Sequence, residues 1–140
     1  MSELEQLVRE TYTALAAGDR ATMERLLAPD FDASFAEGMP LGCGGPHRGA
    51  AAAIDDGWWA IGRSFAVRAE PEEWIETGDG RLLVLGTYRG RARGTGRRFT
   101  ATFAHLWSAR EHKLTGVVQV TDTARWHEAL SADSGTPASA

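Results

Sequence analysis

The sequence lacks the features that would place the protein outside the cell or in a membrane. It has one cysteine, Cys43, which excludes an internal disulfide and a thiolate metal site. No apolar run approaches the roughly 20 residues that span a bilayer. The first ten residues, MSELEQLVRE, are acidic and amphipathic, without the basic start and apolar core of a secretory signal. These absences predict a cytoplasmic protein.

An excess of positive charge is also missing. Lys and Arg number 15 against 19 Asp and Glu, for a formal net charge of -4. Such a chain has no overall electrostatic attraction to nucleic acid or to an anionic membrane, so neither is expected as a partner. The four histidines are scattered, and GCGG lacks the Lys and Ser/Thr of a phosphate loop. We therefore expect neither a metal nor another cofactor.

The composition is that of a folded domain. Hydrophobic residues make up 43% of the 140 and charged residues 24%, a balance that disordered chains do not have. Residues 1–130 are predicted to form one domain. The last ten residues, SADSGTPASA, are small and polar, so residues 131–140 are predicted to be a disordered tail.

Helices are predicted at the start of the chain. The first has an apolar stripe at helical spacing, formed by Leu4, Leu7, Val8, Tyr12 and Leu15. Gly18 ends this helix, and Asp19 is the predicted cap of a second helix, which stops near Pro29. A short extended piece over residues 31–35 follows.

A loop and a third helix come next. EGMPLGCGGPHRG, residues 37–49, is so rich in Gly and Pro that it predicts no regular structure. The third helix is expected over about residues 50–61, with Ile54, Trp58 and Ile61 on one face.

From residue 65 onward the pattern predicts antiparallel strands over residues 66–76, 81–93, 99–109 and 113–121, and then a short helix from Asp122 to Leu130. The fold class is therefore α+β. We expect a cone-shaped α+β barrel, in which a curved antiparallel sheet packs against three N-terminal helices and a short C-terminal helix closes the end. Such a cone encloses a pocket, which is the default ligand site.

This sequence resembles the nuclear-transport-factor-2-like superfamily, specifically its SnoaL-like polyketide cyclase and ketosteroid isomerase branch. The resemblance is carried by AAGDRATMERLLAPDF (16–31), by HRG (47–49) and by FAHLWSAREHKLTGVVQVTDT (103–123). It covers about residues 3–130. It implies a small-molecule pocket, but this fold hosts many unrelated activities.

The family's catalytic residues carry over only in part. Ketosteroid isomerases pair an Asp base with a Tyr and a protonated Asp, and the resemblance places Phe35 at the base position and His105 at the second Asp position. That constellation is absent, which argues against steroid isomerisation by that mechanism. In SnoaL-like cyclases a pocket His and a last-strand Asp transfer protons. His105 matches the His, whereas Gln119 stands at the Asp position.

His105 and Gln119 are the predicted catalytic residues. A three-residue hairpin loop centred on His112 places them opposite each other on one face of the sheet. An imidazole beside a carboxamide can act as acid or base near neutral pH, while the amide orients a carbonyl. The alternative is a core histidine and a cross-strand hydrogen bond without catalytic roles.

The substrate-binding residues are predicted to be mostly aromatic, although residues of this type are more often plain core. They are Tyr12, Phe35, Met39, Trp58, Trp59, Tyr88, Phe103 and Trp107. Two further candidates have competing explanations. Asp122 either replaces the missing acid or caps the last helix, and His47 either closes over a ligand or marks a solvated helix start.

Three functions are compatible with these features. The first is a cofactor-independent isomerase or cyclase that transfers protons on an apolar, carbonyl-bearing, polyketide-like metabolite. The second is a non-catalytic small-ligand-binding module of the same fold. The third is an assembly domain, which would have a pocket filled by its own side chains. Leu83 and Leu85 on the outer sheet face need cover, so we also expect a homodimer.

Overall fold

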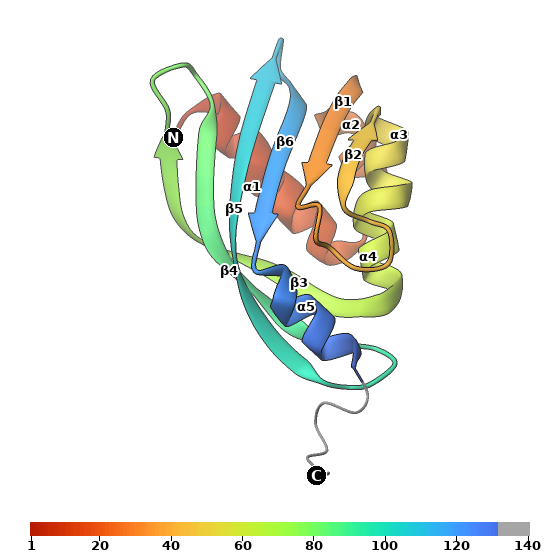
Figure 1. Ribbon diagram of the computed structural model, residues 1–140. Helices are drawn as coiled ribbons and strands as arrows, with labels where there is room; N and C mark the ends of the chain where they lie inside the picture. The colour runs from red at the N-terminus through yellow and green to blue at the C-terminus, as the bar shows by residue number, and fades with distance from the viewer. Residues whose placement is uncertain (132–140) are drawn as a thin grey trace.

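The computed structural model describes residues 1–131, and all its strands belong to one curved sheet. The strand order is β2-β1-β6-β5-β4-β3. Helix α1 crosses one face of this sheet, where it contacts β3, β5 and β6 (Figure 1). The predicted cone-like α+β arrangement is confirmed. Of the expected tail, all but Ser131 lies outside the described residues.

The first two helices begin and end where their capping residues predict. Helix α1 spans Glu3–Ala17, and Gly18 follows it in the left-handed conformation with a φ of 65°. Helix α2 spans Arg20–Leu26, and the carboxylate of Asp19 accepts a hydrogen bond from the backbone N–H of Thr22. The buried face of α1 directs Tyr12 toward the sheet.

Two expectations for the next segment were wrong. Helix α2 ends near Pro29 as predicted, but strand β1, Leu27–Phe35, starts directly after it and not at residue 31, so Pro29 lies inside the strand. Part of the glycine-rich segment also forms a strand, β2 (Gly45–Arg48), which pairs antiparallel with β1. Because β2 is an edge strand, Pro46 can lack an N–H without breaking the sheet's hydrogen bonding.

The third predicted helix is longer than expected and irregular. It consists of α3 (Ala50–Ala52), a π-helical turn η1 (Ala53–Trp58) and α4 (Trp59–Ser64). A Cβ atom on Gly57 would lie 2.8 Å from a ring carbon of Phe35. The glycine therefore lets the helix pass close to the inner face of β1, where Trp58 packs against Phe35.

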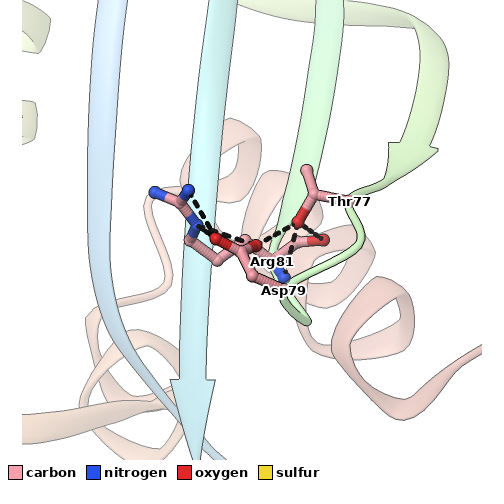
Figure 2. A network of polar contacts seen from close by, with 3 residues as sticks. All are labelled: Thr77, Asp79 and Arg81. Carbon is pink, nitrogen blue, oxygen red and sulfur yellow. Dashed lines mark hydrogen bonds and ion pairs between the residues drawn. The ribbon is translucent and has the colours of Figure 1, made fainter.

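Four long strands and a last helix complete the fold close to the predicted bounds. They are β3 (Phe65–Glu76), β4 (Leu82–Ala92), β5 (Arg98–Arg110), β6 (Lys113–Thr121) and α5 (Thr123–Leu130). The turn between β3 and β4 is closed by Thr77, Asp79 and Arg81, whose side chains bond to one another (Figure 2). No helix within residues 1–131 is long and apolar enough to cross a membrane.

Strands β5 and β6 have the predicted register, but the three-residue loop from which it was predicted is not present. His105 does pair with Gln119 across β5 and β6. However, the loop contains two residues, Glu111 and His112, both with positive φ. The loop is therefore one residue shorter than predicted, and an irregularity in the pairing between Ser108 and Ala109 offsets this difference. A β-bulge shifts facing residues by one, so it compensates for the shorter loop.

A close contact inside the sheet positions the middle of β5. A Cβ on Gly86 would lie 2.6 Å from the ring of Phe103, its cross-strand partner. The missing side chain leaves room for the Phe103 ring, which stacks on the imidazole of His105 at a centroid distance of 4.1 Å. Gly86 therefore allows Phe103 to pack beneath His105 and to support the candidate site.

Candidate functional site

A cavity of about 1330 Å³ lies between the inner face of the sheet and the helices. Tyr12 comes from α1, Trp58 from η1, and Tyr88, His105 and Gln119 from three neighbouring strands. A hollow of this size is large enough for a small organic molecule. A pocket filled by its own side chains, which the assembly-domain hypothesis requires, is therefore not what the structure contains.

The imidazole of His105 lies between two tyrosine hydroxyls. The Tyr12 hydroxyl oxygen is 2.6 Å from Nδ1, and the Tyr88 hydroxyl oxygen is 2.7 Å from Nε2. All three side chains are buried or nearly so, with at most 9% of each residue exposed. Both ring nitrogens of His105 are therefore engaged, each by a different element of the fold.

Each tyrosine hydroxyl also accepts a hydrogen bond from a second neighbour. The indole Nε1 of Trp107 donates to the Tyr12 hydroxyl at 3.2 Å. The amide Nε2 of Gln119 donates to the Tyr88 hydroxyl at 2.8 Å. The Gln119 amide is itself oriented, because its Oε1 accepts from the backbone N–H of Ala36 at 3.2 Å. His105 and Gln119 are thus connected by hydrogen bonds through the Tyr88 hydroxyl, and not by the direct contact that their register suggests.

Burial keeps this network uncharged at neutral pH. Removal from solvent lowers the pKa of His105 from 6.5 to about 3. The same loss of hydration raises the pKa of Tyr12 and of Tyr88 well above the usual range. His105 is therefore a neutral imidazole at pH 7, with one ring nitrogen carrying the proton and the other accepting a hydrogen bond.

The structure brings most of the predicted site residues together at the cavity wall. The predicted residues that line it are Tyr12, Phe35, Trp58, Trp59, Tyr88, His105, Trp107 and Gln119. The other two predicted substrate contacts do not line it. Met39 is buried in the core outside the cavity, and Phe103 lies beneath Tyr88 and His105 as a support for both rings.

Neither of the two further candidates lies at the cavity. The imidazole of His47 is buried in β2, where its Nε2 is 2.7 Å from the carbonyl oxygen of Cys43. It holds the preceding loop in place and is not a solvated helix start. Asp122 does precede α5 as the N-cap residue, but its side chain makes no capping hydrogen bond and pairs with Arg125 at 3.7 Å.

Two tryptophans of the cavity wall were not assigned to it from the sequence. Trp74 packs edge-on against Tyr12, and Trp126 packs edge-on against Tyr88. The pairing of β3 with β4 shifts by one residue between Pro71 and Glu73, which turns Trp74 to the inner face. Pro71 inside a strand was the one available signal of this irregularity.

The charged residues at the cavity wall are all of one sign. Those that line it are Arg9, Arg63, Arg68, Arg89 and Arg93, and none of the described lining residues is Asp or Glu. Residues 1–131 also contain no group of three His, Cys, Asp or Glu that could hold a metal ion. The wall can donate hydrogen bonds to a ligand, but it offers no carboxylate base.

The comparisons with known proteins agree with this geometry. Residues 8–117 match the family model of the SnoaL-like domain. An NTF2-like protein of unknown function from Burkholderia pseudomallei is 34% identical, over 94% of this chain and 100% of its own, with a TM-score of 0.84. No curated protein matches the sequence.

Two further solved structures are similar. TerC, co-crystallised with polyporic acid, is 28% identical over 91% of this chain and 98% of its own, with a TM-score of 0.81. IdmH, a candidate polyketide cyclase from Streptomyces antibioticus, is 20% identical over 92% of this chain and 99% of its own, with a TM-score of 0.76, and shows the shared fold.

Proposed function

The chain belongs to the SnoaL-like domain family, and we propose that its cavity binds an apolar, carbonyl-bearing metabolite and promotes proton transfer on it. The reaction is of the isomerase or cyclase type and needs no cofactor. His105 and Gln119 act at the centre of the site, with the hydroxyls of Tyr12 and Tyr88 facing the ligand.

One observation carries this proposal: a buried, uncharged chain of polar groups lies in the wall of an aromatic cavity. Trp107, Tyr12, His105, Tyr88 and Gln119 are linked in that order by contacts of 2.6 to 3.2 Å. A polar network in a site shielded from water polarises a bound carbonyl more strongly than it would in solution. The bound polyporic acid of TerC supports a small-molecule ligand here as well.

A non-catalytic ligand-binding module is the second candidate function. The specific observation in its favour is the cavity wall, where the described lining residues include no Asp or Glu to accept a proton. Gln119 stands where the resemblance places the catalytic Asp, and an amide cannot accept a proton. In this case the tyrosine hydroxyls hold the ligand oxygen without transferring a proton.

Ligand binding is tested first by tryptophan fluorescence. Trp58, Trp59 and Trp107 line the cavity, so polyporic acid and a panel of flat ketones should quench their emission in a saturable manner. TerC with polyporic acid is the positive control. The variant Trp58→Phe should reduce the signal change, because it removes one of the reporting rings. Unchanged emission with every compound would contradict both candidate functions.

Product analysis then separates the two candidates. Compounds that bind are incubated with the protein and analysed by mass spectrometry and NMR. An isomerised or cyclised product that disappears with His105→Gln supports the enzyme. Saturable binding without any product, at the full length of the incubation, supports the binding module.

We also propose that the protein is a cytoplasmic homodimer. The outer face of the sheet exposes Val118 at 50% and Val120 at 55%, and Ile75 at 41%. A second copy that packs its own sheet on this face would remove these side chains from water. The cytoplasmic location rests on the single cysteine and the composition described above.

A further inference from the structure

The hydrogens of the central network can be counted from its hydrogen-bond contacts. Trp107 and Gln119 each donate to one tyrosine oxygen. The two contacts between His105 and the tyrosines need one hydrogen each. A neutral imidazole supplies one N–H, and each tyrosine supplies one O–H. Three hydrogens are therefore available for two contacts, and one hydroxyl hydrogen has no place within the network.

Only two arrangements satisfy both ring nitrogens. In the first, Nδ1–H donates to Tyr12, the Tyr88 hydroxyl donates to Nε2, and the Tyr12 hydrogen is left over. In the second, the Tyr12 hydroxyl donates to Nδ1, Nε2–H donates to Tyr88, and the Tyr88 hydrogen is left over. Both tyrosines line the cavity. In either arrangement the remaining hydrogen is available to an acceptor on a bound ligand.

We propose that Tyr12, His105 and Tyr88 form a neutral, two-ended proton relay for an enolisable ligand. The ligand carries a carbonyl oxygen at one tyrosine hydroxyl and an acidic C–H at the other. This inference rests on the proposed function, and it adds that the proton enters at one tyrosine and leaves at the other. Tyr12 and Tyr88 are then catalytic residues, while Trp107 and Gln119 position their oxygens.

The proton transfers balance without any ionised group. From the first arrangement, the ligand C–H proton passes to the Tyr88 oxygen as the Tyr88 hydrogen passes to Nε2. The Nδ1 hydrogen passes to the Tyr12 oxygen, and the spare Tyr12 hydrogen passes to the ligand carbonyl. The C–H electron pair becomes the C=C bond of the enol, and the C=O pair becomes its O–H bond. The protein is left in the second arrangement, and ketonisation of the enol restores the first.

The surroundings of the network favour this neutral route. The described wall offers no carboxylate to act as a base. Burial disfavours an imidazolium at His105 and a phenolate at either tyrosine, since each would be a charge held away from water. A relay in which every group gives one proton as it receives another avoids these charged states.

Deuterium exchange of 2-tetralone tests the relay without the natural ligand. This flat ketone has acidic α-hydrogens, and their loss in D₂O is followed by ¹H NMR. The wild-type protein should accelerate exchange over buffer. Tyr12→Phe, Tyr88→Phe and His105→Gln should each slow the protein-dependent rate by at least about 100-fold, and the double Tyr variant should be no slower than either single one.

Controls keep the test independent of folding and binding. Thr100→Val removes one hydroxyl from the exposed outer side of β5 and should exchange 2-tetralone at the wild-type rate. Circular dichroism of each Phe variant checks the fold, and fluorescence titration checks that 2-tetralone still binds. The wild-type rate should also be flat over about pH 5 to 9, because no group of the relay changes its charge in that range.

Four other outcomes would each exclude the relay. Exchange that survives in Tyr12→Phe but not in His105→Gln would overturn the relay and assign a one-ended base. A rate that rises through about pH 6 to 7 would overturn it too, since it would require a titrating imidazole. Binding without exchange would reject the relay and leave the binding function intact. If 2-tetralone does not bind, the proposed ligand class fails and the relay fails with it.

Discussion

The two faces of strands β4, β5 and β6 have opposite characters, although their residues alternate along the same segments. The inner face carries Tyr88, His105 and Gln119, which are buried and bonded to one another. The outer face carries aliphatic residues that nothing in the described chain covers fully. Val118 and Val120, which flank Gln119, are 50% and 55% exposed, whereas Gln119 is 3% exposed.

The outer apolar residues form two continuous rows across the sheet. Their cross-strand pairs run from Ile75 through Leu83 and Leu106 to Val118, and from Leu85 through Ala104 to Val120. Contiguous exposed apolar rows of this kind mark contact surfaces between proteins. The inner face, by contrast, hides polar groups that satisfy each other. One sheet therefore provides a site on its inner side and a candidate interface on its outer side.

The largest effect should come from the inner face when a supporting ring is removed. Trp107 is 1% exposed and packs against Tyr12 and Trp58. Trp107→Ala should lower the free energy of unfolding by about 3 kcal/mol, as the loss of a buried aromatic ring does. Urea denaturation measures this change. The matched variant Leu106→Ala, one residue away on the outer face, should cost about 1 kcal/mol; equal losses would mean that the two faces do not differ.

The second prediction concerns the acid sensitivity that buried His105 imposes. Its pKa falls from 6.5 in the unfolded chain to about 3 in the folded protein. Between these values the unfolded chain binds a proton that the folded protein does not, so stability decreases as the pH falls through this window. The decrease amounts to roughly 1.4 kcal/mol per pH unit.

His105→Gln removes the titrating group, so comparison of the two proteins isolates its contribution. The variant should lose less stability than the wild type when urea midpoints are measured at about pH 7 and about pH 4.5. Carboxylates that titrate in the same range are present in both proteins and cancel. An equal loss of stability in the two proteins would show that His105 is protonated at the same pH in the folded protein as in the unfolded chain.

The third prediction addresses the outer face. Val118→Lys together with Val120→Lys places two charges on the rows that a second copy is proposed to cover. Size-exclusion chromatography with light scattering should find the wild type as a dimer, and the double variant should dissociate at least about 10-fold more readily. Ala21→Lys, on the exposed side of α2, is the charge control. If the wild type is a monomer at all concentrations, the proposed homodimer is wrong.

The smallest effect is expected at the turn between β3 and β4, away from both faces. Asp79 accepts hydrogen bonds from Thr77 and Arg81 (Figure 2). The bond from Arg81 has the largest effect in lowering the pKa of the Asp79 carboxyl, and the bond from Thr77 lowers it further. The stability that Asp79 contributes to the folded protein is fully present above the ordinary Asp pKa, and it is lost as the pH falls from there through the lowered pKa of the folded protein. Because the group is exposed, Asp79→Asn should shift the thermal midpoint by only about 1–2 °C at pH 7. A larger shift would mean that this turn anchors the hairpin.

Much of the fold could be predicted from the sequence because its determinants are local. The caps at Gly18 and Asp19 and the bounds of β6 follow from residues close together in the chain. His105 faces Gln119 as predicted, but through a shorter loop and a shift in pairing that the sequence did not indicate. Strand β2 was missed, because it depends on pairing with β1 rather than on its own composition. The same holds for Trp74, whose orientation depends on a shift in pairing.

The amino-acid sequence by itself determined which side chains share a face within each regular stretch of strand or helix, since alternation along a strand and periodicity along a helix are properties of the backbone. It could not place the Tyr12 hydroxyl at His105, which is 93 residues away along the chain, or the Tyr88 hydroxyl between His105 and Gln119. Those contacts depend on how α1 crosses the sheet and on how β4, β5 and β6 pair with one another. Only the packed tertiary structure decides such distances, because every element that contributes to them must be in place at once.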